Sequence, residues 1–280
     1  MRNDFAVFII THKRPHNQMT VETLRKGGYT GRIWFVVDDE DNTVSEYEKI
    51  YGVENVKVFH KENNFDLADN LTDHKGVPVY ARNECFRIAR DCGVSYFVQL
   101  DDDYPKIDYR YERGGKLLSK PVKSFDGVFE AMVRFLENEK ISCVAFAVAG
   151  DYIGGLSGRF KDGLYRNTRN SFFCKIGSPT EFLGRINEDV TTPAMNNMLG
   201  RLFYTFMGVQ VTLYDHKKNE GGSSEQYKEV DLYWNYFYPV LFIPSAIKLR
   251  YSKKSGFIKS ISWSNLTPMV ISEKWRKDDA

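Results

Sequence analysis

Three consecutive aspartates, Asp101–Asp103, come directly after the apolar run at residues 96–100. Adjacent carboxylates repel one another, and the loss of water beside a buried strand makes their ionised forms less stable still. Hard carboxylate oxygens favour Mg²⁺ or Mn²⁺, and these ions take further ligands from substrate phosphates. On an extended chain Asp101 and Asp103 point to one side and Asp102 to the other. The triplet therefore predicts a site for a divalent metal and a diphosphate, and a hydrated acidic turn is the alternative.

Polar residues also close two other apolar runs. Thr11 and His12 follow the first run of the chain, and Asp38 and Asp39 lie in the acidic end of the second. In a parallel sheet the carboxyl ends of the strands share one edge, and ligands bind beyond that edge. These groups are therefore expected close to the aspartate triplet, where carboxylate and backbone contacts could hold a nucleotide base.

The elements that must position these groups alternate short apolar runs with amphipathic stretches. The apolar runs predict strands at residues 5–10, 32–41, 55–60, 96–100 and 142–150. Helical spacing of apolar residues predicts helices at residues 21–29, 44–52, 77–94 and 125–140. Unbroken apolar strands that alternate with helices favour an α/β fold, with a mostly parallel sheet covered on both faces.

The second half of the chain lacks this regular alternation. Residues 151–185 are rich in Gly, Arg and aromatic residues, which suits either an antiparallel ribbon or an active-site loop region. Residues 192–215 predict a helix and then a strand, and residues 238–251 predict one or two strands broken by Pro244. Since no repeat, low-complexity tract or linker divides the chain, a single domain over residues 1–280 with a mixed α+β C-terminal half is expected.

Four further residues carry groups that could take part in chemistry. Arg82 could pair with a diphosphate or with the aspartates, and a surface charge at a helix end is the alternative. Glu188 and Asp189 could accept a proton from an acceptor hydroxyl, or could cap a helix. His216 could be a metal ligand or phosphate contact, or a solvent-facing histidine. Neither a Walker-type phosphate loop nor a G-x-G-x-x-G motif is present, which disfavours P-loop and dinucleotide redox chemistry.

Charge is almost balanced overall, with 39 basic and 37 acidic residues, but it is uneven along the chain. Residues 105–123 carry six Lys or Arg against two acids, and residues 246–276 carry seven against one acid, Glu273. Such stretches suit a polyanion such as nucleic acid, and a solvated face is the alternative.

Cysteine usage and hydropathy predict a soluble cytoplasmic protein. The four cysteines, at positions 85, 92, 143 and 174, show no metal-ligand spacing and are expected to be reduced. The N-terminus is too short and too acidic for a signal peptide, and no apolar run is long enough to cross a membrane. The missing membrane segment counts against a lipid substrate.

The order of the acidic strand ends, the D-x-D motif and the downstream acidic pair resembles nucleotide-sugar-dependent glycosyltransferases of the GT-A fold. Six longer blocks carry a narrower resemblance: "FIITHKRP", "GYTGRIWFVVDDED", "YARNECFRIARDCGVSYFVQLDDDY", "INEDVTT", "FIPSAIKL" and "ISWSNLTPMVISEKW". Together they look like the bacteriophage glycosyltransferases of hydroxymethylated DNA pyrimidines, the TET/JBP-associated glycosyltransferase group, which are relatives of the transferase that builds glucosylated base J. The resemblance covers residues 5–275, nearly the whole chain.

This resemblance implies a role for each candidate residue. Thr11 and Asp38 or Asp39 would hold the uridine of a UDP-sugar, and Asp102 would lie near the ribose or the donor sugar. The full donor-binding set is Thr11, His12, Arg14, Asp38, Asp39, Arg82, Asp101 and Asp102. The metal ligands for Mn²⁺ or Mg²⁺ would be Asp101, Asp103 and His216. Glu188 and Asp189 would be catalytic, and Asp189 would act as the base if the anomeric centre inverts.

The reaction implied by the resemblance moves a sugar from UDP to the hydroxymethyl oxygen of a modified cytosine or uracil in double-stranded DNA. Residues 1–150 would form the nucleotide-sugar half and residues 151–280 the acceptor half. The residues expected to contact DNA phosphates are Lys248, Arg250, Lys253, Lys254 and Lys259, and the aromatic residues that could stack on an extruded base are Trp263, Tyr165 and Phe160. No membrane and no obligate protein partner is expected.

Three other functions compete with this interpretation. The first is a GT-A enzyme acting on a glycan or protein, and the second is a nucleotide-sugar-binding module without catalysis. The third is a nucleotidyltransferase, which would also use paired acids with a metal. The basic stretches favour DNA over a glycan, the intact acidic pairs favour catalysis, and the absence of a Gly-rich phosphate loop disfavours a nucleotidyltransferase.

Overall fold

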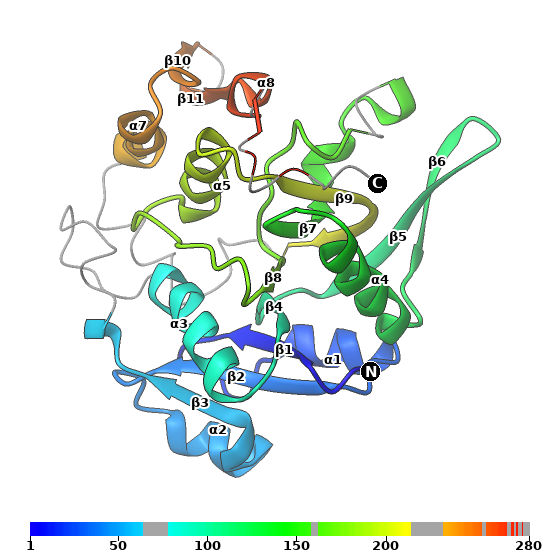
Figure 1. Ribbon diagram of the computed structural model, residues 1–280, viewed down its shortest axis with the longest axis vertical. Coiled ribbons are helices and arrows are strands. Elements are labelled where there is room, and N and C mark those ends of the chain that lie inside the picture. The colour runs from blue at the N-terminus through cyan, green and yellow to red at the C-terminus, as the bar shows by residue number, and fades with distance from the viewer. Residues whose placement is uncertain are drawn as a thin grey trace.

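The apolar runs of the first half form strands of one central sheet (Figure 1). The computed structural model describes residues 1–63, 78–157, 162–213, 232–253, 256–267, 270–271, 273 and 276. Within these ranges the strands of the central sheet are β1 (Phe5–Ile10), β2 (Arg32–Asp38), β3 (Val56–Phe59), β4 (Tyr96–Asp101), β5 (Lys106–Arg113), β6 (Lys116–Pro121), β7 (Cys143–Val148), β8 (Phe172–Lys175) and β9 (Phe203–Thr212).

The sheet order is β3-β2-β1-β4-β8-β7-β9-β5-β6. The first four strands in this order are parallel, and β7 and β9 are parallel to each other. β8 runs against β4 and β7, and β5 runs against β9 and β6. Among the described strands of this nine-stranded sheet, only β8 and β5 therefore oppose the common direction, which confirms the predicted α/β class with a mostly parallel sheet.

Helices cover both faces of this sheet. The helices of the described ranges are α1 (Met19–Lys26), α2 (Val44–Tyr51), α3 (Pro78–Asp91), α4 (Phe125–Asn138), α5 (Glu188–Met198), α7 (Leu232–Phe242) and α8 (Trp263–Leu266), with short 3₁₀ turns η1 (Val53–Asn55), η3 (Ala149–Tyr152) and η4 (Gly155–Ser157). The four helices of the first half match the predicted helices to within a few residues at each end.

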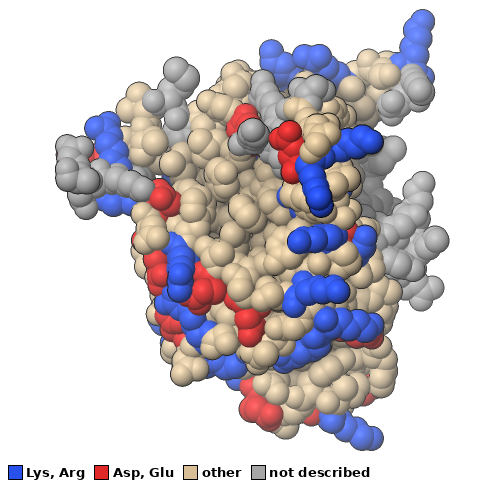
Figure 2. All heavy atoms as spheres, turned by 90° about the vertical axis from the view of Figure 1, so that its right-hand side faces the viewer, with Lys and Arg blue, Asp and Glu red and all other residues tan. Residues whose placement is uncertain are grey.

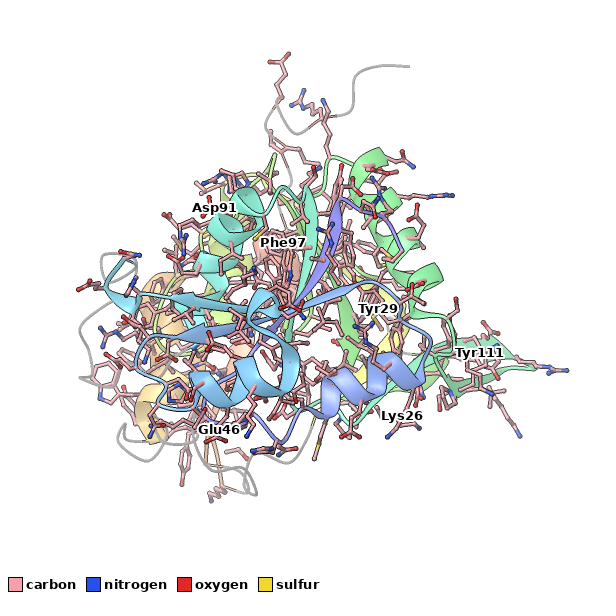
Figure 3. All side chains as sticks on the ribbon, turned by 90° about the horizontal axis from the view of Figure 1, so that it is seen from below. Lys26, Tyr29, Glu46, Asp91, Phe97 and Tyr111 are labelled. Carbon is pink, nitrogen blue, oxygen red and sulfur yellow. The ribbon has the colours of Figure 1, made fainter. Side chains whose placement is uncertain are left out.

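Alternation along β1 shows how the two faces are filled. Phe5 packs in a cluster with Leu24 of α1 and Phe129 of α4, whereas Phe8 packs in a second cluster with Phe86 of α3 and Phe97 of β4. In Figure 3, seen from below, Phe97 lies on the side of the sheet that α3 covers. Because both faces of β1 are buried, its residues are apolar throughout, and the first polar side chains come where the strand leaves the sheet.

The C-terminal half adds a smaller layer above the sheet. The antiparallel strands β10 (Ile247–Ser252) and β11 (Gly256–Ile261) form a separate two-stranded sheet. An apolar cluster with members such as Val190, Ile243 and Ile247 joins this sheet to α5 and α7 (Figure 1). Within the described residues, no helix is long and apolar enough to cross a membrane.

In three local regions the structure corrects, decides or adds to the predictions. Residues 238–242 were expected to be a strand but are the end of α7, because Tyr238 and Phe242 pack at helical spacing and Pro239 forms part of the helix. Of residues 151–185, the described ranges 151–157 and 162–185 consist of turns and loops with one short strand, the antiparallel β8, which favours the loop alternative over the ribbon. The hairpin of β5 and β6 was not predicted, although Gly114 and Gly115 at its turn are a hairpin signal.

Candidate active site

The aspartate triplet lies at the carboxyl end of β4, where the first turn of α1 holds its backbone. The Thr20 hydroxyl donates to the Asp101 carbonyl oxygen over 2.6 Å and accepts from the Tyr104 amide over 2.9 Å. The Thr20 amide donates to the Asp102 carbonyl oxygen over 3.0 Å. Because Thr20 is fully buried, these bonds face no competition from water and fix the directions in which the three carboxylates leave the turn.

Asp102 is buried against the end of β1. Its Oδ2 accepts from the Thr11 hydroxyl over 2.6 Å, and its Oδ1 accepts from Arg14 Nη1 over 3.0 Å. The Thr11 oxygen in turn accepts from Gln18 Nε2 and shares a hydrogen bond with the Tyr47 hydroxyl. Burial raises the pKa of Asp102, although Arg14 and Thr11 act in the opposite direction. Thr11 thus orients an aspartate of the triplet through its side chain.

A buried arginine joins the triplet to the downstream acidic pair. Arg82, on α3, is only 2% exposed. Its Nη2 donates to Asp101 Oδ1 and its Nε donates to Glu188 Oε1, each over 3.1 Å. The other carboxylate oxygen of Asp101 accepts from the Tyr104 hydroxyl over 2.7 Å. Residues 82, 101 and 188 are separated in the sequence, and the fold brings Arg82 into contact with both Asp101 and Glu188.

Two carboxyl groups of this cluster hold their protons near neutral pH. Burial raises the pKa of Asp103 to about 7, and the negative charges of Asp101 and Asp102 add to the effect. Burial also raises the pKa of Glu188 to about 7, with Arg82 acting against the shift and Asp189 adding to it. The positive charges of Arg14 and Arg82 lower these two pKa values, but they do not offset the effects of burial and of the neighbouring carboxylates.

The acidic pair begins α5, as the sequence predicted. Asn187, which precedes the helix, has a left-handed backbone with φ of 57°. Its side-chain amide donates to the Asn235 carbonyl oxygen over 2.9 Å, and its Oδ1 accepts a bond from Lys259 Nζ on β11. Lys259 is thus engaged with Asn187, and its contact with a DNA phosphate stays a prediction. Asp189 is half-buried in the first turn of the helix.

The acidic end of β2 forms a second polar cluster. Asp38 is paired with His12 over 2.7 Å and with Lys61 over 2.8 Å, and Asp39 is paired with His60 over 2.8 Å. Burial raises the pKa of Asp38, but the hydrogen bonds from His12 and Lys61 outweigh burial, so this pKa lies below its ordinary value. Asp38 is thus an ionised, fixed acceptor beside the end of β1.

The chemistry of the triplet fits a divalent cation. Burial and the charges of Asp101 and Asp102 disfavour the ionised form of Asp103, a cost that a bound cation would offset, and each oxygen of Asp101 keeps a lone pair beside its one hydrogen bond. Asp101 and Asp103 would therefore hold Mg²⁺ or Mn²⁺, with the remaining ligands from water or a diphosphate. Among the described residues, no three His, Cys, Asp or Glu side chains are grouped to hold a metal by themselves. The predicted third ligand, His216, lies outside the described residues.

Sequence reasoning missed several residues that build this site. Tyr104 directly follows the triplet, so its position was a local signal that it could contact the aspartates. Thr20 and Lys61 contact the site from other elements, and no feature of the sequence around them indicates this. Of the three aromatic residues proposed to stack on a base, Tyr165 is 39% exposed and Trp263 packs partly buried beside the α5 cluster. Phe160 and Lys254 lie outside the described residues.

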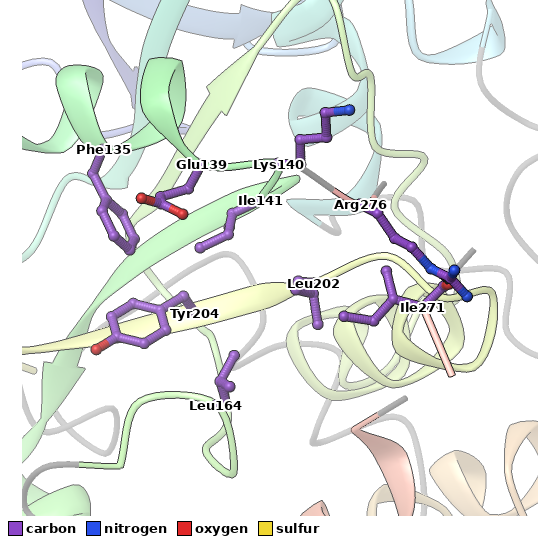
Figure 4. A pocket seen from close by; sticks show the side chains of 9 residues that line it. All are labelled: Phe135, Glu139, Lys140, Ile141, Leu164, Leu202, Tyr204, Ile271 and Arg276. Carbon is purple, nitrogen blue, oxygen red and sulfur yellow. Dashed lines mark hydrogen bonds between the residues drawn. The ribbon is translucent and has the colours of Figure 1, made fainter. Parts of the chain in front are cut away.

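An apolar cavity of about 410 Å³ lies elsewhere in the molecule (Figure 4). Its lining includes Ile141, two residues before β7, Leu202, directly before β9, and Phe135 of α4. Because β7 and β9 run in the same direction as β4, their amino ends lie at the sheet edge opposite Asp101. This cavity is therefore separate from the carboxylate cluster.

Solved structures that resemble this chain include two complexes of glucosyl-3-phosphoglycerate synthase from Mycobacterium tuberculosis. The complex with Mg²⁺ and UDP is 10% identical over 92% of this chain and 86% of that chain, with a TM-score of 0.47. The complex with Mn²⁺ and UDP-glucose is 10% identical over 94% and 90%, with a TM-score of 0.46. A putative nucleotide-diphospho-sugar transferase from Desulfovibrio desulfuricans is 8% identical over 75% and 80%, with a TM-score of 0.43. These likenesses assign no residue a role.

No curated protein matches the chain. The model of the TET-associated glycosyltransferase family matches residues 5–222, which is more than half of the sequence. The matched region contains the aspartate triplet, Arg82 and the acidic pair at the start of α5. The protein belongs to the TET-associated glycosyltransferase family and is a glycosyltransferase.

Proposed function

We propose that this enzyme moves a sugar from a UDP-sugar to the hydroxymethyl group of 5-hydroxymethylcytosine or 5-hydroxymethyluracil in double-stranded DNA, with Mn²⁺ or Mg²⁺ bound. The observation that carries the proposal is the buried bridge from Asp101 through Arg82 to Glu188. It joins a carboxylate cluster suited to a metal and diphosphate to a second acidic pair, which suits a reaction between two substrates. Membership of the family supports sugar transfer as the reaction class.

On the donor side, each residue of the triplet has its own surroundings. Asp101 and Asp103 would hold the metal, which when bound neutralises negative charge on the departing diphosphate. Arg82 and Tyr104 fix the orientation of the Asp101 carboxylate, and Thr11 fixes that of Asp102. The uridine would lie toward the acidic end of β2, since the Thr11 hydroxyl is already engaged with Asp102.

On the acceptor side, Glu188 and Asp189 take different roles. Glu188 is buried and bonded to Arg82, so it fixes the geometry between the two halves of the site. Asp189 is half-buried in the same helical turn and would accept the proton of the acceptor hydroxyl in an inverting reaction.

The test of the proposed function is a measurement of UDP release and sugar transfer. The purified protein is incubated with Mn²⁺, a panel of UDP-sugars and duplex DNA with or without hydroxymethylated pyrimidines. We expect transfer only to the hydroxymethylated duplex, detected as a mass increase of one sugar per modified base. UDP release with glycan or protein acceptors alone would contradict the proposed acceptor, and no release with any donor would contradict the proposed donor.

The same assay checks the role of Asp103. The substitution Asp103→Asn should abolish metal-dependent turnover, because it removes the negative charge of a proposed metal ligand. The melting temperature of the metal-free variant should be equal to or above that of the wild type, since a crowded negative charge is gone. Asp91→Asn, an exposed aspartate on α3, is the matched control and should keep full activity. Normal metal-dependent turnover in Asp103→Asn would show that the triplet is only an acidic turn.

A further inference from the structure

The polar groups of the site follow one another along the carboxyl edge of the sheet. In the order β2-β1-β4-β8-β7, Asp38 ends β2, Thr11 follows β1 and the aspartate triplet lies at the end of β4. Because β8 runs antiparallel between β4 and β7, the residues just before β8 lie at this same edge. Arg169 and Asn170 are among those residues. Arg169 therefore lies on the side of the triplet away from β2, where the uridine is proposed to bind.

The turn that carries Arg169 is fixed to the strands on both sides of it. The Tyr104 hydroxyl, which bonds the triplet, also lies 2.8 Å from the Asn170 carbonyl oxygen. The Ser171 hydroxyl accepts from the Phe146 amide of β7 over 2.9 Å. Asn170 has a left-handed backbone with φ of 66°, a conformation that Asn adopts more readily than most residues. These contacts give the backbone of Arg169 a defined position beside the carboxylate cluster.

The guanidinium of Arg169 lies at the acceptor end of the site. A Cβ added to Gly150, just beyond the end of β7, would lie 3.6 Å from Nη2 of Arg169. Burial lowers the pKa of Lys259, the charge of Asp189 acts against this shift, and the charge of Arg169 adds to it. Since the interaction between charges weakens with distance, Arg169 and the proposed base Asp189 both lie near the Lys259 amine.

Arg169 has no carboxylate partner among the described residues. Its Nε is buried without a hydrogen-bond partner there, and no described Asp or Glu lies within salt-bridge distance of its guanidinium. The side chain is half-buried, so part of its hydration is lost, and the Lys259 amine nearby adds a like charge. A cation that is partly removed from water costs free energy unless an anion pairs with it. The position of Arg169 therefore favours an anionic ligand.

We propose that Arg169 binds a backbone phosphate next to the modified base of the acceptor strand, while that base presents its hydroxymethyl group to Asp189. Phosphates carry the negative charge of DNA, and the planar guanidinium pairs with phosphate through two parallel hydrogen bonds. The charge of the donor diphosphate would be offset instead by the metal at the triplet. The inference rests on the proposed function, because it takes DNA as the acceptor.

The test measures binding of a labelled, hydroxymethylated duplex by fluorescence anisotropy over a series of salt concentrations. Arg169→Gln should weaken binding about 10-fold to 100-fold, because one charge-assisted contact is lost. The slope of log K against log salt should become smaller by about 1. Arg169→Lys keeps the charge and should recover the wild-type slope, although it forms one hydrogen bond in place of two and should not recover the full affinity.

Duplexes with one neutral methylphosphonate identify the phosphate. The linkage replaces the phosphate on the 5′ or on the 3′ side of the modified base in two separate duplexes. At one of these positions the wild-type protein should lose affinity by a factor similar to the effect of Arg169→Gln. The variant should lose little more with that duplex, because the contact is already gone. Losses that multiply at both positions would show that Arg169 binds neither phosphate and would overturn the inference.

Arg113→Gln is the control for general electrostatic attraction. It removes the same charge from an exposed position at the turn of the β5–β6 hairpin. Figure 2 shows the side of the molecule on which this hairpin projects and on which Lys and Arg side chains gather. The control should weaken binding less than Arg169→Gln and should keep the full effect of the methylphosphonate. Equal behaviour of the two variants would contradict a specific contact. Unchanged melting temperatures show that the variants are folded.

The inference and the proposed function fail separately. UDP release from a UDP-sugar without DNA reports on the donor site alone. If Arg169→Gln raises the KM for the UDP-sugar and leaves the affinity for DNA unchanged, Arg169 binds the donor diphosphate, which overturns the inference and leaves the proposed function standing. If the wild type binds the duplex through Arg169 but transfers no sugar to it, the proposed function is wrong and the phosphate contact stands.

Discussion

At the scale of single residues, the site is governed by charges that are taken out of water. Arg82 is buried between Asp101 and Glu188, and its guanidinium also lies 5.0 Å from the centre of the Phe172 ring. A buried cation with two carboxylate partners gives little net stability over an apolar side chain, but its removal leaves two negative charges without compensation. Such an arrangement is retained for geometry, since one planar guanidinium fixes both carboxylates at once.

Arg82→Met should therefore lower the free energy of unfolding by roughly 3 to 5 kcal/mol, because it breaks a buried ion pair from one side. Arg134→Met on α4 is the control, since Arg134 is exposed and its ion pair with Glu130, one helical turn away, is open to water. The control should lose at most about 1 kcal/mol. Urea unfolding of both variants decides the point, and equal losses would show that Arg82 acts as an ordinary surface charge.

The raised pKa of Glu188 predicts how the free energy of unfolding changes with pH. Its pKa is raised from 4.5 to about 7 in the folded protein, so the folded state holds the proton more tightly than the unfolded state. The stability that Glu188 contributes is therefore fully present below about pH 4.5 and is lost as the pH rises through about 7. We expect the free energy of unfolding of the wild type, relative to Glu188→Gln, to fall from about pH 5 to pH 8. Urea unfolding of the metal-free proteins at several pH values measures this difference, and a constant difference would contradict the raised pKa.

At the scale of elements, the triplet depends on how α1 and β4 meet. The amide and the hydroxyl of Thr20, in the first turn of α1, form hydrogen bonds with the backbone of residues 101–104. These bonds fix the turn that carries the triplet. Thr23, one turn further along, adds a single bond to the Tyr104 carbonyl oxygen. A helix that looks like simple cover for the sheet therefore sets the geometry of the proposed metal site.

Thr20→Val keeps the shape of the side chain and removes its hydroxyl. The buried Tyr104 amide and Asp101 carbonyl oxygen would each lose a partner, so we expect a loss of about 1 to 3 kcal/mol in the free energy of unfolding. Turnover should fall further than stability alone accounts for, because the carboxylates lose their fixed directions. Thr23→Val removes one hydrogen bond and should have the smaller effect on both. Steady-state kinetics at saturating Mn²⁺ measure the difference in turnover. Equal turnover in the two variants would show that the hydrogen bonds of the Thr20 hydroxyl do not position the carboxylates.

At the scale of the whole molecule, the two predicted halves share one sheet and one site. β8 and β9, from residues 151–280, lie between strands of residues 1–150 in the sheet order. The carboxylate cluster takes Asp101 and Arg82 from the first half and Glu188 from the second. Substrates proposed for the two halves would therefore meet at Arg82.

Local signals in the sequence were enough for much of this architecture. Unbroken apolar runs and helical spacing predicted β1–β4, β7 and α1–α4, because such patterns report burial on two faces or on one. The position of the triplet at a strand end followed from the same pattern. The local pattern gave the wrong prediction for residues 238–242, because their aromatic and β-branched composition favours a strand. They are helical in the structure, where Tyr238 packs against the loop before α5.

The sequence by itself determined the fold class, the edge of the sheet that carries the acids, and the residue types that could hold a metal. Only the tertiary structure decided which charges meet: Arg82 with both Asp101 and Glu188, Thr11 with Asp102, and Lys259 with Asn187. The physical reason is that periodicity records whether a side chain is buried, which is a local property of the chain. Contacts between charges separated by tens of residues depend on how the elements pack, and no local pattern encodes that packing.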